Sequence, residues 1–220
     1  MKRTRASSQF WLWFERNSDR YLHLTQVRTK KEFVFWFDEL QTHAMAYCKL
    51  LAVDFCLPQH SKGQLVITCH GKTMGFKKAE QLVRLAPALK NWEIIALRQP
   101  KSVVDLKDWT GPKVDIGLSS IWFQVYKQVV EGIHPIRVYV DYILPGKEWD
   151  VREHAMMFIE QLVGEKVAVM NIDLLEVDSR CNASKRQRLR PLAELPEYIA
   201  EQARGIKVMP DGRLSIEGDD

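Results

Sequence analysis

The chain has 220 residues, of which 46% are hydrophobic and 27% are charged, and its net charge is +4. This composition is ordinary for a folded soluble protein, so it excludes a largely disordered chain, and the length allows one large domain or two small ones. No apolar run approaches the ~20 residues needed to cross a bilayer, and the small charge excess excludes the strongly basic surface of a typical nucleic-acid binder.

Two aromatic clusters stand near the start of the chain, Phe-Trp-Leu-Trp-Phe at residues 10–14 and Phe-Val-Phe-Trp-Phe at 33–37. Each lies in a pattern of helical spacing, with Ser7 or Ser8 as the expected N-cap of the first helix and Thr29 as the start of a capping box for the second. Because a helix gains most of its stability by burying an apolar stripe, we expect these rings to fill a core.

Two aromatic residues do not follow the core stripes of these helices. Trp11 and Phe35 each lie beside the stripe of their helix. We therefore expect both side chains to be exposed and to offer a surface to a protein partner or to a second copy of the chain.

The next elements indicate a strand hairpin followed by a helix and a strand. Residues 50–57 and 64–69 are apolar and β-branched, and a turn rich in polar residues joins them. Apolar residues over 76–86 recur at helical spacing, and 92–97 returns to the alternation of a strand.

Residues 99–117 contain proline and glycine with little periodicity, which predicts a long connection and a weak internal boundary. The remaining patterns predict a hairpin of strands 121–130 and 136–144, a helix over 151–162 that ends at Gly164, a strand over 166–177, a short helix over 192–199, and a small hairpin or tail over 205–220. We expect a single α+β domain over residues 1–220, with two aromatic helices, a mostly antiparallel mixed sheet and further helices packed on it. No repeat is evident beyond the paired aromatic clusters.

A Gly-Lys-Thr sequence at residues 71–73 precedes the helix over 76–86 and invites comparison with a phosphate-binding loop. Such a loop needs a second glycine five positions earlier, where this chain has Val66 in the middle of a strand. We therefore expect a plain turn there, without a nucleotide cofactor.

Cys56, His60, Cys69 and His70 are the only close group that could supply four metal ligands. Their spacing matches no zinc motif, so we expect no metal site. The four cysteines of the chain are scattered, which is typical of free thiols in a reducing compartment. The first residues do not form a signal peptide, and we expect a cytoplasmic protein.

An enzyme would need converging titratable groups, and His70, Asp141 and His154 are the candidates for a polar pocket. None of them lies in a known catalytic motif. Arg137 and Asp141 share one face of a predicted strand, where they line such a pocket or form an ordinary ion pair; we favour the ion pair.

The sequence contains one basic cluster, formed by Lys185, Arg186, Arg188 and Arg190. Guanidinium groups bind oxyanions in a bidentate way, so this cluster is a candidate site for an anion or a nucleic acid. It lacks a nearby aromatic side chain for base stacking, and a solvated loop explains it equally well.

Three stretches, residues 10–14, 65–93 and 191–199, resemble a family of bacterial proteins of unknown function. The shared features are an aromatic Phe-Trp-x-Trp-Phe first helix, a strand-helix-strand unit and a Leu-Pro-x-Tyr-Ile closing segment. The resemblance implies a fold but no reaction, cofactor or site residue.

These observations favour a soluble bacterial protein that acts by binding and not by catalysis. The alternatives are an enzyme of unrecognised class with a polar pocket, and a protein that binds an anion or a nucleic acid through residues 185–190.

Overall fold

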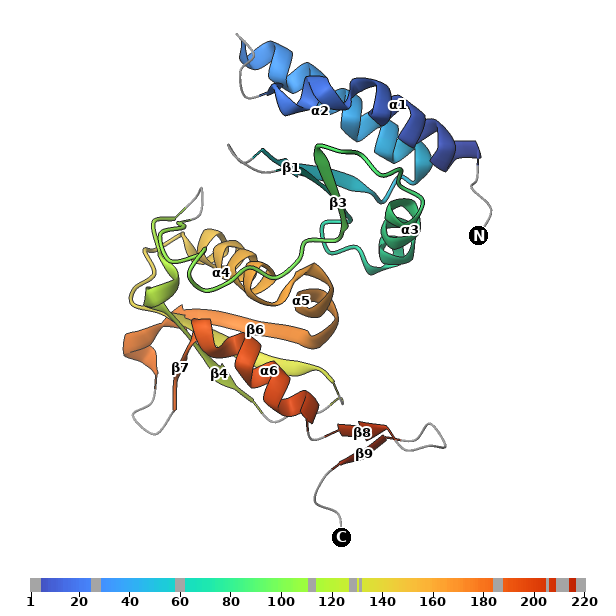
Figure 1. Ribbon diagram of the computed structural model, residues 1–220. Coiled ribbons are helices and arrows are strands. Elements are labelled where there is room, and N and C mark those ends of the chain that lie inside the picture. Colours follow the sequence, from blue (N-terminus) through green and yellow to red (C-terminus); the bar gives the residue numbers. More distant parts are fainter. Residues whose placement is uncertain are drawn as a thin grey trace. The chain divides into compact units, whose positions relative to one another are not determined.

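The computed structural model describes residues 5–24, 29–57, 62–110, 114–126, 130, 132–183, 188–204, 206–208 and 214–216 (Figure 1). The chain forms two units, Met1–Gln99 and Pro100–Asp220. The division falls at the start of the segment 99–117, where the sequence indicates a weak boundary. Among the described residues, no helix combines the length and the apolar character that a membrane span requires.

The first unit consists of α1 (Arg5–Leu22), α2 (Lys30–Tyr47), β1 (Ala52–Cys56), β2 (Gly63–Thr68), α3 (Thr73–Arg84) and β3 (Trp92–Ala96). Its sheet has the order β1-β2-β3, with β1 antiparallel and β3 parallel to β2. The predicted hairpin, helix and strand are all present.

Aromatic side chains fix α1 and α2 to one face of this sheet. Phe55 on β1 packs against Tyr21 of α1 and against Phe33 and Phe37 of α2, with ring centroids 6.0 to 6.3 Å apart. Tyr21 is fully buried, whereas Phe33, Phe37 and Phe55 are only partly buried. The prediction that the clustered rings fill a core is confirmed for Phe10 and Phe14 of the first cluster, which are buried.

The two predicted helix starts have different outcomes. The hydroxyl of Thr29 accepts a hydrogen bond from the backbone N–H of Glu32 at 3.2 Å, which confirms the cap of α2. The N-cap predicted for α1 at Ser7 or Ser8 is wrong, because α1 already includes Arg5. Ser7 is fully buried inside the helix, where a small side chain allows close packing.

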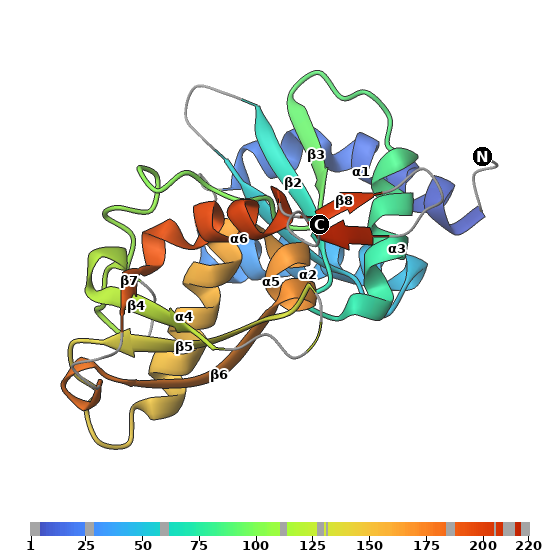
Figure 2. The same cartoon turned by 90° about the horizontal axis from the view of Figure 1, so that it is seen from below.

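The second unit contains η2 (Leu118–Ser120), β4 (Ile121–Val125), β5 (His134–Val140), α4 (Glu148–Val163), α5 (Glu165–Asn171), β6 (Ile172–Ser179), η3 (Arg180–Asn182), β7 (Arg190–Pro191), η4 (Leu192–Glu194), α6 (Leu195–Arg204), β8 (Ile206–Val208) and β9 (Leu214–Ile216). Its main sheet has the order β6-β5-β4-β7, with β5 parallel to β6 and antiparallel to β4 (Figure 2). β8 and β9 form a separate antiparallel pair, as predicted for the end of the chain.

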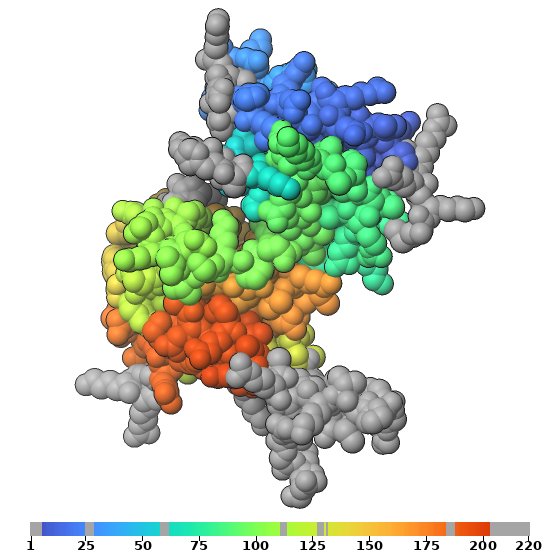
Figure 3. All heavy atoms as spheres, in the orientation of Figure 1, coloured from blue at the N-terminus to red at the C-terminus, as the bar shows by residue number. Residues whose placement is uncertain are grey.

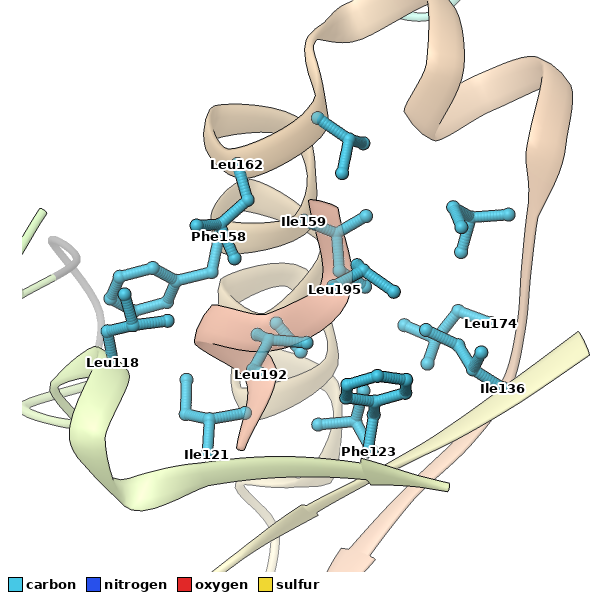
Figure 4. Close-up of a cluster of buried hydrophobic side chains, with 14 of the residues drawn as sticks. Leu118, Ile121, Phe123, Ile136, Phe158, Ile159, Leu162, Leu174, Leu192 and Leu195 are labelled. Atoms are coloured by element: carbon cyan, nitrogen blue, oxygen red, sulfur yellow. The ribbon is translucent and has the colours of Figure 1, made fainter. Parts of the chain in front are cut away.

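The core of the second unit lies between one face of this sheet and the helices. Figure 4 shows Ile159 of α4 on the side of the strands that carry Phe123 and Ile136, and the ring of Phe158 beside Leu118 of η2. Leu192 and Leu195 close the same core, and both are fully buried. The Leu-Pro-x-Tyr-Ile segment is therefore a structural element of this core.

One predicted strand is partly wrong. The pattern over 166–177 predicts a strand, but α5 takes its first half and β6 begins only at Ile172. Gly164, at φ +83°, ends α4 as predicted and allows α5 to begin directly after it. Packing of Ala168, which is 1% exposed, outweighs the β-propensity of the valines around it.

The two units share a chain topology. In each, an antiparallel hairpin leads through helix to a third strand that lies parallel to the second strand of the hairpin. The fold is α+β, as predicted, and the described strands form one mixed sheet in each unit and the separate β8-β9 pair.

Candidate interaction surfaces

Trp11 does not contribute to an exposed surface. Its side chain is 2% exposed, and its indole Nε1 donates a hydrogen bond to the carbonyl of Leu82 at 2.9 Å. The exposure predicted for Trp11 is therefore wrong. The side of α1 that lies beside its core stripe faces α3, so this helix has neighbours on two sides.

Phe35 is exposed, as predicted, with 54% of its side-chain surface open to solvent. Its ring makes a T-shaped contact with Trp36 at 5.1 Å. Its neighbour Val34 is 42% exposed. The role of Phe35 as a partner surface stays a prediction.

The three candidates for an enzyme pocket differ in exposure and in bonding partners. His70 is exposed in a turn after β2, with φ +47°. The side chain of Asp141 is 62% exposed and lies 3.8 Å from Arg180. His154 is 2% exposed in α4, with Nε2 2.6 Å from the carbonyl of Ile116. An exposed carboxylate and a core imidazole do not line a common site, which does not favour the enzyme alternative.

The predicted ion pair of Arg137 with Asp141 is wrong. Arg137 pairs with Glu176 of β6, which is its register partner, while Asp141 pairs with Arg180. Residues four apart on one strand are separated by about 13 Å, whereas neighbours across strands are about 5 Å apart. The pKa of Arg137 is raised, mainly by a hydrogen bond with Tyr139, so the guanidinium remains charged.

No group of three or more potential metal ligands occurs among the described residues. His60, one of the four candidate ligands, lies outside them. Cys56 is exposed and Cys69 is buried, so these two thiols have different environments.

The basic cluster is only partly described, since Lys185 and Arg186 lie outside the described residues. Arg190 is held by two carboxylates, at 3.0 Å from Glu194 and 3.8 Å from Glu201. Its charge is therefore balanced within the protein and is not open to an anion. Arg188 is exposed.

The most exposed aromatic side chains of the described protein lie elsewhere, on the connection between β5 and α4. Trp149 is 67% exposed, and Tyr142 and Leu144 are each 61% exposed. We call residues 141–150, with these three side chains, the aromatic segment. Sequence reasoning missed it because it extended the preceding strand to Leu144, whereas β5 ends at Val140.

Hydrogen bonds fix the first half of the aromatic segment. The backbone N–H of Ile143 donates to the hydroxyl of Ser179 at 3.0 Å, and Ile143 packs against the core of the second unit. A turn follows, in which the N–H of Lys147 donates to the carbonyl of Leu144 at 2.9 Å. Gly146 lies at φ +78° in this turn, a conformation that suits glycine after proline.

The second half is fixed as well. Lys147 forms an ion pair with Asp150 at 2.7 Å, and Glu148 accepts a hydrogen bond from the N–H of Gly146 at 3.2 Å. Trp149 therefore projects from the first turn of α4 on a backbone that is held on both sides. The signal in the sequence was Pro145-Gly146, which marks a turn between the two exposed rings.

Comparison with models of protein families, with curated proteins and with solved structures found no match to this chain. The resemblance to a bacterial family therefore stays a prediction, and the geometry of the described residues carries the functional argument.

Proposed function

We propose that this protein is a non-catalytic binding protein that holds another protein through the aromatic segment. The observation that carries the proposal is the exposure of Tyr142, Leu144 and Trp149 on a segment fixed by hydrogen bonds. Tyrosine and tryptophan dominate the binding energy of protein interfaces, because they bury a large area with few rotatable bonds.

The fixed backbone of the aromatic segment supports the proposal in a second way. Ordering a loose loop on binding costs free energy, and a segment that is already ordered avoids this cost. The ion pair of Lys147 with Asp150 balances one carboxylate near Trp149, and Glu148 leaves a negative charge beside this ring. The surface is therefore suited to an apolar pocket with a basic rim on a partner protein.

The two alternatives have less support. The enzyme alternative depends on His70, Asp141 and His154, of which Asp141 is exposed in an ion pair and His154 is buried against a backbone carbonyl. The anion alternative depends on the basic cluster, where Arg190 is already balanced by two glutamates. We also propose the bacterial cytoplasm as the compartment, since the four cysteines are free.

A comparison of three immobilised proteins tests the proposal: the wild type, the double variant Tyr142→Ser/Trp149→Ser, and the control Val104→Ser. Val104 is 81% exposed and lies outside the aromatic segment, so the control removes a similar exposed apolar side chain. Any lysate protein that the immobilised wild type retains is purified. Its Kd is then measured for the wild type, the double variant and the control.

We expect the double variant to weaken binding at least tenfold and the control to leave it unchanged. Equal Kd values for the wild type and the double variant would contradict the proposal. Sedimentation velocity of the wild type at rising concentration distinguishes a second copy of the chain from a different protein.

A further inference from the structure

The outer edge of β4 is only partly covered. The backbone N–H of Tyr126 donates to the carbonyl of Pro135 at 2.9 Å, so at this position the backbone faces β5. Because the backbone groups of a strand point alternately to its two sides, the N–H and C=O of Phe123 and Val125 point to the other edge. The strand β7 covers this edge at Phe123, which is paired with Arg190.

β7 has only two residues and ends before it reaches Val125. In a continued antiparallel pairing, Val125 would stand opposite Arg188. Arg188 and Leu189 are not part of β7, and a groove of about 580 Å³ lies along Gln124, Val125, Arg188 and Leu189. This volume lies within the range of ligand pockets. Within the described part of the chain, the N–H and C=O of Val125 have no hydrogen-bond partner.

Two other strand edges of the protein carry a cover. On β1, the side-chain amide of Gln41 donates to the carbonyl of Leu51 at 3.0 Å and accepts from the N–H of Val53 at 3.1 Å. Unpaired strand edges invite pairing with other chains, and proteins usually block them.

On β6, the register shifts by one residue at Leu175, which forms a bulge. Arg152 donates to the carbonyls of Leu174 at 2.6 Å and Leu175 at 3.2 Å and so occupies this edge. The edge at Val125 differs from both, because it faces a groove and no side chain of the described residues is hydrogen-bonded to it.

Arg188 favours a carboxylate on the part of an occupant that lies beside Val125. Arg190 is balanced by Glu194 and Glu201, which line the same groove. Arg188 is exposed and has no ion pair among the described residues. The two arginines and the two glutamates that line the groove give these residues no net charge, and Arg188 is the positive group that lies beside Val125 without an ion pair to a described residue. Figure 3 shows the second unit as spheres, with α6 in orange-red on the visible face.

We propose that this groove binds an extended, acidic peptide segment of a partner protein, which pairs with Val125 as an added strand and places a carboxylate against Arg188. Strand addition takes its affinity from backbone hydrogen bonds and its specificity from the side chains beside the edge. Leu189 and Val125 offer apolar contacts to the neighbouring residues of the peptide. The site shares no residue with the aromatic segment, so it does not depend on the proposed function.

Fluorescence anisotropy with labelled heptapeptides tests this site on the full chain. The acidic probe is Ser-Thr-Val-Glu-Val-Thr-Ser, and the matched basic probe has lysine in place of glutamate. The variant Val125→Pro removes the outward N–H and leaves the hydrogen bonds to β5 intact, since proline is tolerated on an open strand edge. The control Val125→Thr keeps the N–H and a branched side chain.

We expect the acidic probe to bind the wild type, Val125→Thr to preserve this Kd, and Val125→Pro to raise it roughly tenfold. Arg188→Glu should reverse the preference, so that the basic probe binds better than the acidic one. If Val125→Pro does not fold, an acidic probe with N-methylated backbone at its central residues takes its place and should bind roughly tenfold more weakly.

Two outcomes would overturn the proposal. One is no binding of the acidic probe to the wild type at millimolar protein. The other is an unchanged Kd of the acidic probe both for Arg188→Glu and in the backbone test that is used, which is Val125→Pro or the N-methylated probe.

Discussion

The indole nitrogen of Trp11 donates a hydrogen bond to the carbonyl of Leu82 at 2.9 Å, and so ties α1 to α3 across 71 positions of sequence. The donor and the acceptor are both buried. The same ring makes a T-shaped contact with Phe10 at 4.7 Å. Trp11 therefore stabilises the first unit in two ways, through the burial of its apolar ring surface and through the hydrogen bond of its Nε1.

Replacing Trp11 separates these two contributions. Trp11→Phe keeps an aromatic ring but removes the indole donor, while the carbonyl of Leu82 still accepts from the N–H of Leu85 at 3.1 Å, so the free energy of unfolding should fall by about 0.5–1.5 kcal/mol. Trp11→Ala also leaves a cavity and should cost about 3–5 kcal/mol. Urea unfolding followed by circular dichroism measures both, and two equal losses would contradict the role given to the hydrogen bond.

Gly75, in the first turn of α3, allows a close approach to Cys69. A Cβ atom at this glycine would lie 2.6 Å from the sulfur of Cys69 and 3.2 Å from Leu50 Cβ, which is too close for an unshifted structure. Gly75→Ala should therefore destabilise the protein by about 1–3 kcal/mol, although alanine has the higher helix propensity.

A matched control and a rescue sharpen this prediction. At Gly117 an added Cβ meets no atom within 4 Å, so Gly117→Ala should leave the thermal midpoint nearly unchanged. Cys69→Ala removes the sulfur, and the double variant with Gly75→Ala should recover part of the lost stability. Additive losses in the double variant would show that the sulfur is not the obstacle.

Local patterns of the sequence predicted most elements, because helices and strands depend on periodicity and on end signals that lie close together. Thr29 caps the start of α2 and Gly164 follows the last residue of α4, and both helix boundaries were expected. Trp11 was misplaced because its burial depends on α3, a distant neighbour that no local pattern reveals.

The same limit explains the sheets and the surfaces. The pairing of Arg137 with Glu176 requires β6 to lie parallel to β5, and no short sequence pattern specifies the order of strands in a sheet. The aromatic segment was hidden because Tyr142 and Leu144 continue the apolar alternation of β5 after the strand has ended. The shared topology of the two units left no repeat in the sequence, since different residues satisfy the same packing.

Gln41 should protect the edge of β1. Gln41→Met keeps a similar volume and removes both hydrogen bonds to the strand, at Leu51 and Val53. We expect a loss of about 1–2 kcal/mol in the free energy of unfolding and faster aggregation, because the edge is then open to pairing. Gln9→Met, at an exposed position of α1, is the control. Light scattering during incubation at 37 °C measures aggregation, and equal rates for the two variants would contradict a protective role.

The stability of the protein should fall as the pH decreases below neutrality, in part because of His134. This side chain is 6% exposed at the start of β5, in T-shaped contact with Tyr198, and its burial lowers the pKa of the imidazole. A lowered folded pKa means that the unfolded chain binds the proton more tightly. The stabilising contribution is therefore complete above the unfolded pKa of 6.5 and is lost as the pH falls through 6.5 toward the folded pKa.

His43 has the same direction of shift, since its burial under the Trp13 ring at 3.9 Å also lowers its pKa. A buried histidine of this kind changes the free energy of unfolding by at most about 1.4 kcal/mol for each pH unit between its two pKa values. Urea unfolding at pH 7.5 and pH 5.5 should show the wild type less stable at the lower pH. His134→Gln and His43→Gln should each reduce the difference between the two pH values, and the double variant should reduce it further. A difference that stays the same in all three variants would assign the acid sensitivity to other groups, because neither imidazole would then gain a proton on unfolding.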